Sequence, residues 1–149
     1  MVEIGFYHLT RSRIEDALPR LLEKALSLGH RMVVRVADAE RLESLNRHLW
    51  TYDPHGFLPH GVRADGFPER QPVFLSTEIE NPNRADVLVL VGETGVPEIE
   101  GFARVVDLFD GDDREAVEAA RARWRAWQRA GHALAYYQQE DSGAWRRAR

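Results

Sequence analysis

Apolar residues follow two patterns along the chain: short runs that suit strands, and wider spacings that suit helices. The runs predict five strands, over residues 2–9, 31–36, 72–76, 85–91 and 103–109. The run at 85–91, ADVLVLV, is almost entirely apolar. Such a run is typical of a strand that is covered on both faces of a parallel sheet.

The wider spacings predict three helices, over residues 12–29, 38–50 and 112–131. Each helix has a capping residue at its start: Ser12 with Glu15 as a capping box, then Asp38, then Asp112 or Asp113. A glycine closes the first and the third range, as is common at helix ends. Because strands alternate with helices, we expect an α/β fold with a mainly parallel sheet and helices on both faces.

The segment at 49–61, LWTYDPHGFLPHG, is too rich in proline and glycine for a regular element. It nevertheless carries four large apolar side chains, those of Trp50, Tyr52, Phe57 and Leu58. Large apolar side chains in a loop either fill the core or face a partner. The pattern leaves both possibilities open.

Length and composition favour one domain over residues 1–149. Hydrophobic residues make up 44% of the chain and charged residues 30%, which is ordinary for a globular protein. No apolar run approaches the roughly 20 residues of a membrane span, and the N-terminus does not resemble a secretion signal. The chain has no cysteine, which excludes disulfides and thiolate metal sites. We therefore expect a cytoplasmic protein.

Charge is distributed unevenly between the two parts of the chain. Residues 119–149 hold seven arginines and two acidic residues, a net charge of +5, whereas the whole chain carries −4. Residues 1–118 therefore carry −9. The basic helix and tail at 112–149 indicate an anionic partner at that end, whereas the acidic remainder argues against broad wrapping of a nucleic-acid backbone.

The loops that would bind a nucleotide phosphate lack the residues for it. TRSRIED follows the first strand without a glycine cluster, and GETGVPEIEG follows the buried strand without Gly-Lys-Ser/Thr. The only lysine, Lys24, lies inside the first predicted helix. We expect no cofactor, although a nucleotide-dependent enzyme on a Rossmann-like sheet remains an alternative.

Other catalytic and metal patterns are equally weak. His55 and His60 share a loop with Asp53 and Asp65, but their spacing is not that of a regular metal site. The chain has no Gly-x-Ser-x-Gly elbow to mark a nucleophile. We therefore expect neither a catalytic residue nor a metal ligand.

The last predicted helix has two stripes at 100° per residue. An apolar stripe, which should face the sheet, consists of Val117, Ala120, Trp124, Trp127 and Gly131. A basic stripe consists of Arg121, Arg125 and Arg129, which Trp124 borders, and Arg123 stands apart from both stripes. The stripe is either a solvated basic face or a binding surface.

Two tyrosines favour the binding surface. Tyr136 and Tyr137 follow the expected turn at Gly131 and could fold back beside the helix. Guanidinium groups beside aromatic walls suit a carboxylate attached to an apolar group. Such a surface fits an acidic peptide with a hydrophobic end better than DNA, although direct binding of single-stranded nucleic acid remains a further alternative.

Several motifs, in order along the chain, resemble one known family. They are FYHL in the first strand, LW followed by FLPHG, VDLFDG before the last helix, then ARARWRAWQRAGHALAYYQQ and a late GAW. Together they resemble the chi subunit of bacterial DNA polymerase III holoenzyme, a clamp-loader accessory protein. The resemblance implies a Rossmann-like fold and a non-catalytic role in DNA replication, in the cytoplasmic, nucleoid-associated replisome.

The resemblance also implies two partner surfaces. One binds the acidic, phenylalanine-ended C-terminal tail of single-stranded DNA-binding protein, and by position it maps to Arg121, Trp124, Arg125 and Tyr136. Gln128 stands where a basic residue can occur, and Arg129 beside it can compensate. Contact with DNA is then only indirect.

The second surface binds the psi subunit or another clamp-loader subunit, and in some relatives a repair helicase. By position it maps to Trp50, Phe57, Pro59 and His60. The resemblance therefore implies a bridge between the clamp loader and the protein that coats single-stranded DNA.

Overall fold

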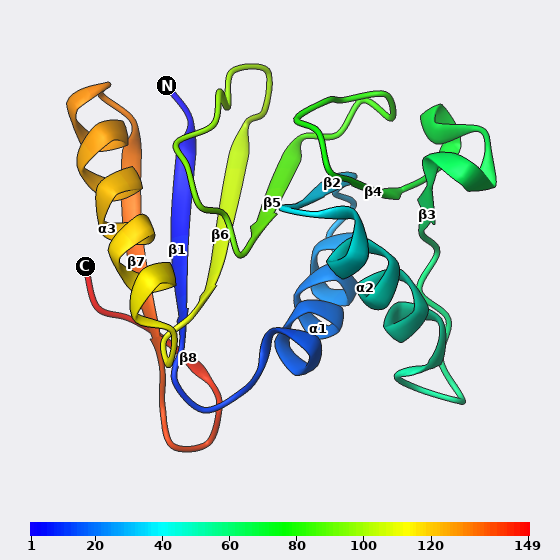
Figure 1. The fold of residues 1–149 in the computed structure, drawn as a ribbon, viewed down its shortest axis with the longest axis horizontal. Coiled ribbons are helices and arrows are strands. Elements are labelled where there is room, and N and C mark those ends of the chain that lie inside the picture. Colours follow the sequence, from blue (N-terminus) through cyan, green and yellow to red (C-terminus); the bar gives the residue numbers. More distant parts are fainter.

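The computed structural model describes residues 1–149, whose strands join in one eight-stranded sheet (Figure 1). The strand order is β3-β4-β2-β5-β6-β1-β7-β8. The strands are β1 (Glu3–Leu9), β2 (Met32–Val36), β3 (Gly61–Val62), β4 (Val73–Ser76), β5 (Val87–Val91), β6 (Arg104–Asp110), β7 (Ala133–Gln139) and β8 (Trp145–Arg147). Every neighbouring pair is parallel except β7 and β8. The predicted α/β fold with a mainly parallel sheet is confirmed.

Helices cover both faces of this sheet. They are α1 (Ile14–Ser27), α2 (Ala39–Thr51) and α3 (Arg114–Arg129), with short 3₁₀ turns at Arg63–Asp65 and Pro68–Arg70. α1 and α2 pack on one face, and α3 packs on the other, along β1 and β7 (Figure 1). None of the helices combines the length and the apolarity that a membrane crossing requires.

The buried strand β5 lies between two hydrophobic cores. Val87, Val89 and Val91 belong to the core under α1 and α2. Leu88 and Leu90 point the other way, into the core under α3. All five residues of the strand are buried, so the apolar run identified a strand covered on both faces.

The predicted capping box of the first helix is wrong. α1 begins after Arg13, and no side chain caps it. The hydroxyl of Ser12 instead accepts a hydrogen bond from Gln139 Nε2, at 3.1 Å. The Oε1 atom of Gln139 accepts from the backbone N–H groups of residues 10, 11 and 12, so an amide from β7 organises this turn. The caps at Asp38 and Asp113 are confirmed by their hydrogen bonds to the first turns of α2 and α3.

Three strands are absent from the prediction. Strand β3 is only two residues long and lies in the proline-rich and glycine-rich loop. Strands β7 and β8 form an antiparallel pair after α3. The expected turn is present at Gly131, which has a φ of +89° and follows the last turn of the helix. The tyrosines after it form part of β7, which extends the sheet beside β1.

The face of α3 that contacts the sheet differs from the predicted stripe. Ala120 and Trp127 are buried as expected, but Arg123 is also buried, with 0% of its side chain exposed. Its Nε and Nη2 atoms donate to the carboxylate of Asp107 on β6, at 2.6 and 3.0 Å. Its Nη1 donates to the backbone oxygen of Glu93, at 2.7 Å. A buried two-pronged ion pair therefore fixes α3 on the sheet.

Candidate functional site

A cavity of about 470 Å³ opens between α3 and the strands beneath it. Strands β1, β6 and β7 supply its floor, and α3 supplies one wall. Its lining comprises Phe6, His8, Phe109, Val117, Ala120, Arg121, Trp124, Arg125, Gln128, Tyr136 and Arg149. The structure therefore brings together four of the five residues that were predicted to bind a peptide tail.

The apolar part of the cavity is built from aromatic rings. The ring of Phe6, on β1, lies 5.2 Å from that of Trp124 and 5.8 Å from that of Trp127, both in tilted contacts. Such contacts hold the indole of Trp124 in place while part of it stays exposed to the cavity. The pocket therefore offers a preformed surface for an apolar group.

His8 and Tyr136 form the polar floor. The Nδ1 atom of His8 lies 2.6 Å from the Tyr136 hydroxyl, and the imidazole stacks on Phe109 with ring centres 4.9 Å apart. Burial, and then the positive charge of Arg121, lower the pKa of His8 below its ordinary value of 6.5. At neutral pH the imidazole is therefore mostly neutral, and arginines supply the positive charge of the site.

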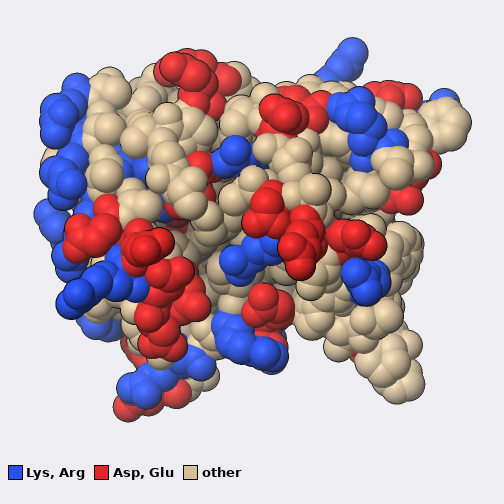
Figure 2. Space-filling view, in the orientation of Figure 1, with Lys and Arg blue, Asp and Glu red and all other residues tan.

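The arginines stand at the rim of the cavity, on α3. Arg121 pairs with Glu118 at 3.3 Å, and this ion pair is exposed. Arg125 lines the cavity and forms no ion pair, so its guanidinium is free to bind an anion. Arg129, one turn further along α3, is exposed but lies outside the lining. Figure 2 shows arginine side chains gathered along the edge of the molecule over α3.

Arg149 was not identified from the sequence. Its guanidinium lies over the indole of Trp124, 5.1 Å from the ring centre, and it lines the cavity. No helical or strand spacing links residue 149 to residue 124, so the sequence carries no signal for this contact. Phe6, His8 and Phe109 were missed for the same reason, because the order of the strands brings them under α3.

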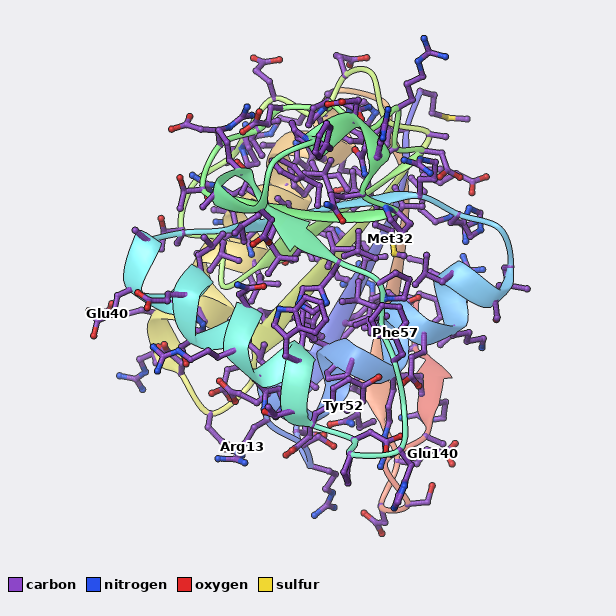
Figure 3. All side chains as sticks on the ribbon, turned by 90° about the vertical axis from the view of Figure 1, so that its right-hand side faces the viewer. Arg13, Met32, Glu40, Tyr52, Phe57 and Glu140 are labelled. Atoms are coloured by element: carbon purple, nitrogen blue, oxygen red, sulfur yellow. The ribbon has the colours of Figure 1, made fainter.

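A second surface lies at the end of α2. The ring of Trp50 contacts those of Phe57 and His60, with ring centres 6.1 and 4.4 Å apart. Trp50 is 51% exposed and Phe57 is 74% exposed, whereas Leu58, next to Phe57 in the sequence, is 2% exposed and joins the core. The loop therefore places one of its large apolar side chains in the core and leaves two exposed to solvent. Figure 3 shows Phe57 on the segment that leaves α2.

The remaining members of this loop contribute to its fold. Pro59 is half-buried, and His60 is buried with its Nδ1 2.7 Å from the backbone oxygen of Leu58. The hydroxyl of Tyr52 donates to Glu23 on α1, which ties the loop to that helix. The histidines of the loop join no group of three or more His, Asp or Glu side chains that could hold a metal ion.

Comparison with known proteins identifies one family. The model of the family described as DNA polymerase III chi subunit, HolC, matches residues 1–135. A probable DNA polymerase III subunit chi from Rickettsia prowazekii is 33% identical over 109 residues, which are 73% of this chain and 66% of that protein.

Two further relatives have the same name. The DNA polymerase III subunit chi of Pseudomonas aeruginosa is 26% identical over 90% of this chain and 94% of its own length. That of Escherichia coli is 23% identical over 83% of this chain and 84% of its own length. The similarity thus extends over most of the sheet and its three helices.

Proposed function

The chain belongs to the DNA polymerase III chi subunit family, and we propose that it ties single-stranded DNA-binding protein to the clamp loader as a non-catalytic accessory subunit. Family membership makes it an accessory subunit in DNA replication. The proposal adds a ligand for the cavity under α3, namely the acidic, phenylalanine-ended tail of the coating protein. It also adds a clamp-loader partner, such as a psi subunit, for the Trp50–Phe57 surface.

The observation that carries the proposal is the composition of the cavity. Arg121 and Arg125 stand at its rim, and the rings of Phe6 and Trp124 form its apolar side. A guanidinium binds a carboxylate through two parallel hydrogen bonds, and a partly enclosed aromatic surface holds an apolar ring. A peptide that ends in phenylalanine presents both groups on one residue, and preceding aspartates would extend the contact along the rim.

Such a site suits a weak, reversible tether. Charge pairs at a surface contribute little singly, whereas a forked pair beside a desolvated ring contributes several kcal/mol. Micromolar affinity corresponds to about −8 kcal/mol and is reasonable for a short peptide. Several tails on one coated strand raise the effective concentration, so that a weak contact suffices. Because part of the attraction is between charges, binding should weaken as salt rises.

The second surface supplies the other end of the tether. Trp50 and Phe57 are large apolar side chains exposed to solvent side by side. Exposed aromatic clusters of this kind anchor protein interfaces. We assign this surface to a clamp-loader-side subunit, with a repair helicase as a second user of the same aromatic group.

The experiment is a titration with a labelled acidic peptide that ends in phenylalanine, followed by fluorescence anisotropy. Arg125→Glu should weaken binding by about tenfold or more, because it removes a forked contact and adds a repelling charge. Arg129→Glu is the matched control, because it makes the same charge change one turn away and outside the cavity. Its effect should stay within about threefold at physiological salt.

Two outcomes would remove the assignment. If wild type and Arg125→Glu bind the peptide equally well, the cavity is not the binding site. If an unstructured oligonucleotide binds in the absence of any peptide, and Arg125→Glu abolishes that binding, the arginines serve nucleic acid instead. The net charge of −9 on residues 1–118 favours a short peptide confined to the cavity over a long nucleic acid, whose phosphates would meet the acidic remainder of the chain.

A further inference from the structure

The last residues of the chain return to the cavity through strand β8. In the ladder between β7 and β8, Arg147 lies opposite Tyr137, and Arg146 lies opposite Gln138. Side chains alternate between the two faces of a strand. An unbroken ladder would therefore place the side chain of Arg149 on the same face as that of Arg147, away from α3.

The ladder is instead broken by a β-bulge. The backbone N–H groups of Ala148 and Arg149 both donate to the backbone oxygen of Tyr136, at 2.7 and 3.3 Å. The N–H group of Tyr136 donates back to the oxygen of Arg149, at 2.9 Å. The two residues that follow β8 thus oppose a single residue of β7, which is the pattern of a β-bulge and redirects the side chains there.

The redirected side chain lies in the cavity under α3. The guanidinium of Arg149 stacks over Trp124, whereas Arg147 lines a different hollow on the opposite face of the sheet. Arg149 forms no ion pair, so no acidic side chain of the protein competes for its charge. Stacking on the indole restricts the orientation of the guanidinium before an anion binds, which lowers the entropy cost of binding.

We propose that Arg149 is a further ligand-binding residue of this cavity, which forks to a carboxylate of the acidic peptide. The inference rests on the proposed function, because it needs the peptide as ligand. Arg149 and Arg125 both line the cavity, with the indole of Trp124 as part of the same lining. The family match ends at residue 135, so this contact comes from a segment outside it.

The test uses the full chain and the labelled acidic, phenylalanine-ended peptide at about 0.15 M salt. Arg149→Ala should weaken binding by about fivefold, as expected for one partly exposed charge contact. Arg149→Lys should fall between Ala and wild type, because lysine keeps the charge but loses the fork and the stacking. Arg147→Ala is the matched control and should stay within about twofold, because it removes the same charge from the opposite face.

The outcomes separate this inference from the proposed function. If wild type binds the peptide and Arg149→Ala binds it equally well or more tightly, Arg149 is not a binding residue, while the proposed function stands. If Arg147→Ala and Arg149→Ala weaken binding equally, only net charge matters and the inference is wrong. If wild type does not bind the peptide, both the proposed function and this inference fall. The substitutions leave the backbone bonds of the bulge in place, but Arg147→Ala also removes the hydrogen bond from its Nε to the backbone oxygen of Arg149. Thermal unfolding curves of both variants would verify that the fold is kept.

Discussion

Breaking the buried ion pair between Arg123 and Asp107 should strongly weaken the packing of α3 on the sheet. Replacing Arg123 with methionine keeps an unbranched side chain of similar length but removes every charged contact. The carboxylate of Asp107, which is 0% exposed, then has no partner. The backbone oxygen of Glu93 also loses the hydrogen bond from Nη1.

The size of the effect follows from these losses. Removing one partner of a buried pair leaves an uncompensated charge and typically costs about 3–5 kcal/mol. A domain of this size is stable by about 5–15 kcal/mol in total. Arg123→Met should therefore lower the free energy of unfolding by about 3–5 kcal/mol, a large share of the total. The melting temperature should fall by roughly 10 °C.

The assay is urea unfolding followed by tryptophan fluorescence, with a double-mutant cycle. Arg125→Met is the matched control, because it is the same substitution two residues along the helix at an exposed position, and it should change stability by less than about 0.5 kcal/mol. Combining Arg123→Met with Asp107→Leu removes both charges. The double variant should recover at least about 2 kcal/mol relative to the sum of the single variants.

Two results would refute this reasoning. A loss below about 1 kcal/mol for Arg123→Met would mean that Asp107 is neutral or solvated in the native state. Burial raises the pKa of Asp107 while Arg123 opposes that shift, so the charge of the carboxyl depends on this contact. A double variant as unstable as the sum of the two single variants would mean that the residues do not interact.

Three further predictions follow from other positions. Gly111→Ala should lower the free energy of unfolding in urea by about 1–3 kcal/mol, because the added Cβ would lie 2.5 Å from the backbone oxygen of Leu9. Gly95→Ala is the control, because its added Cβ would lie 3.7 Å from the nearest atom. Equal losses in the two variants would contradict the argument. Phe57→Ser should change the free energy of unfolding by less than about 0.5 kcal/mol, because Phe57 is exposed, yet it should abolish co-purification of clamp-loader subunits. Unchanged co-purification would rule out the Trp50–Phe57 surface as the binding site for these subunits. Burial, and then the positive charge of Arg121, lower the pKa of His8, so wild type should lose stability as the pH falls below 6.5. The free energy of unfolding of His8→Gln should depend less steeply on pH below 6.5 than that of wild type. The same dependence in both proteins would contradict the lowered pKa.

The sequence predicted the fold well where a pattern depends on neighbours along the chain. The strand at 85–91 and the caps at Asp38 and Asp113 are such cases, because apolar runs and caps act locally. The pair of β7 and β8 was missed because none of their residues is fully buried, so neither strand has a strong apolar pattern. Strand β7 also pairs with β1, which lies more than a hundred residues earlier in the chain, so no local pattern signals that contact.

The candidate site divides in the same way. Helical spacing placed Arg121, Trp124 and Arg125 together correctly, because residues three and four apart share a helix face. Arg123 was placed apart because amphipathic patterns assume that charge faces water. The missed signal was Asp107, a carboxylate with two apolar residues on either side of it in the strand, which requires a buried cationic partner.

The positions of the two surfaces bear directly on the proposed bridge. The cavity lies under α3, on β1 and β7, whereas the Trp50–Phe57 surface follows α2, on the opposite face of the sheet and toward its other edge (Figure 1). The two surfaces share no residue, and the buried strands β2 and β5 lie between them. A peptide in the cavity therefore cannot occupy the space of a subunit on the aromatic surface. A bridge requires both contacts at once. The closely packed sheet between the two surfaces is nearly incompressible, so it keeps the distance between them constant. Under the proposed function, this geometry would let the protein hold its two partners at a fixed distance from each other.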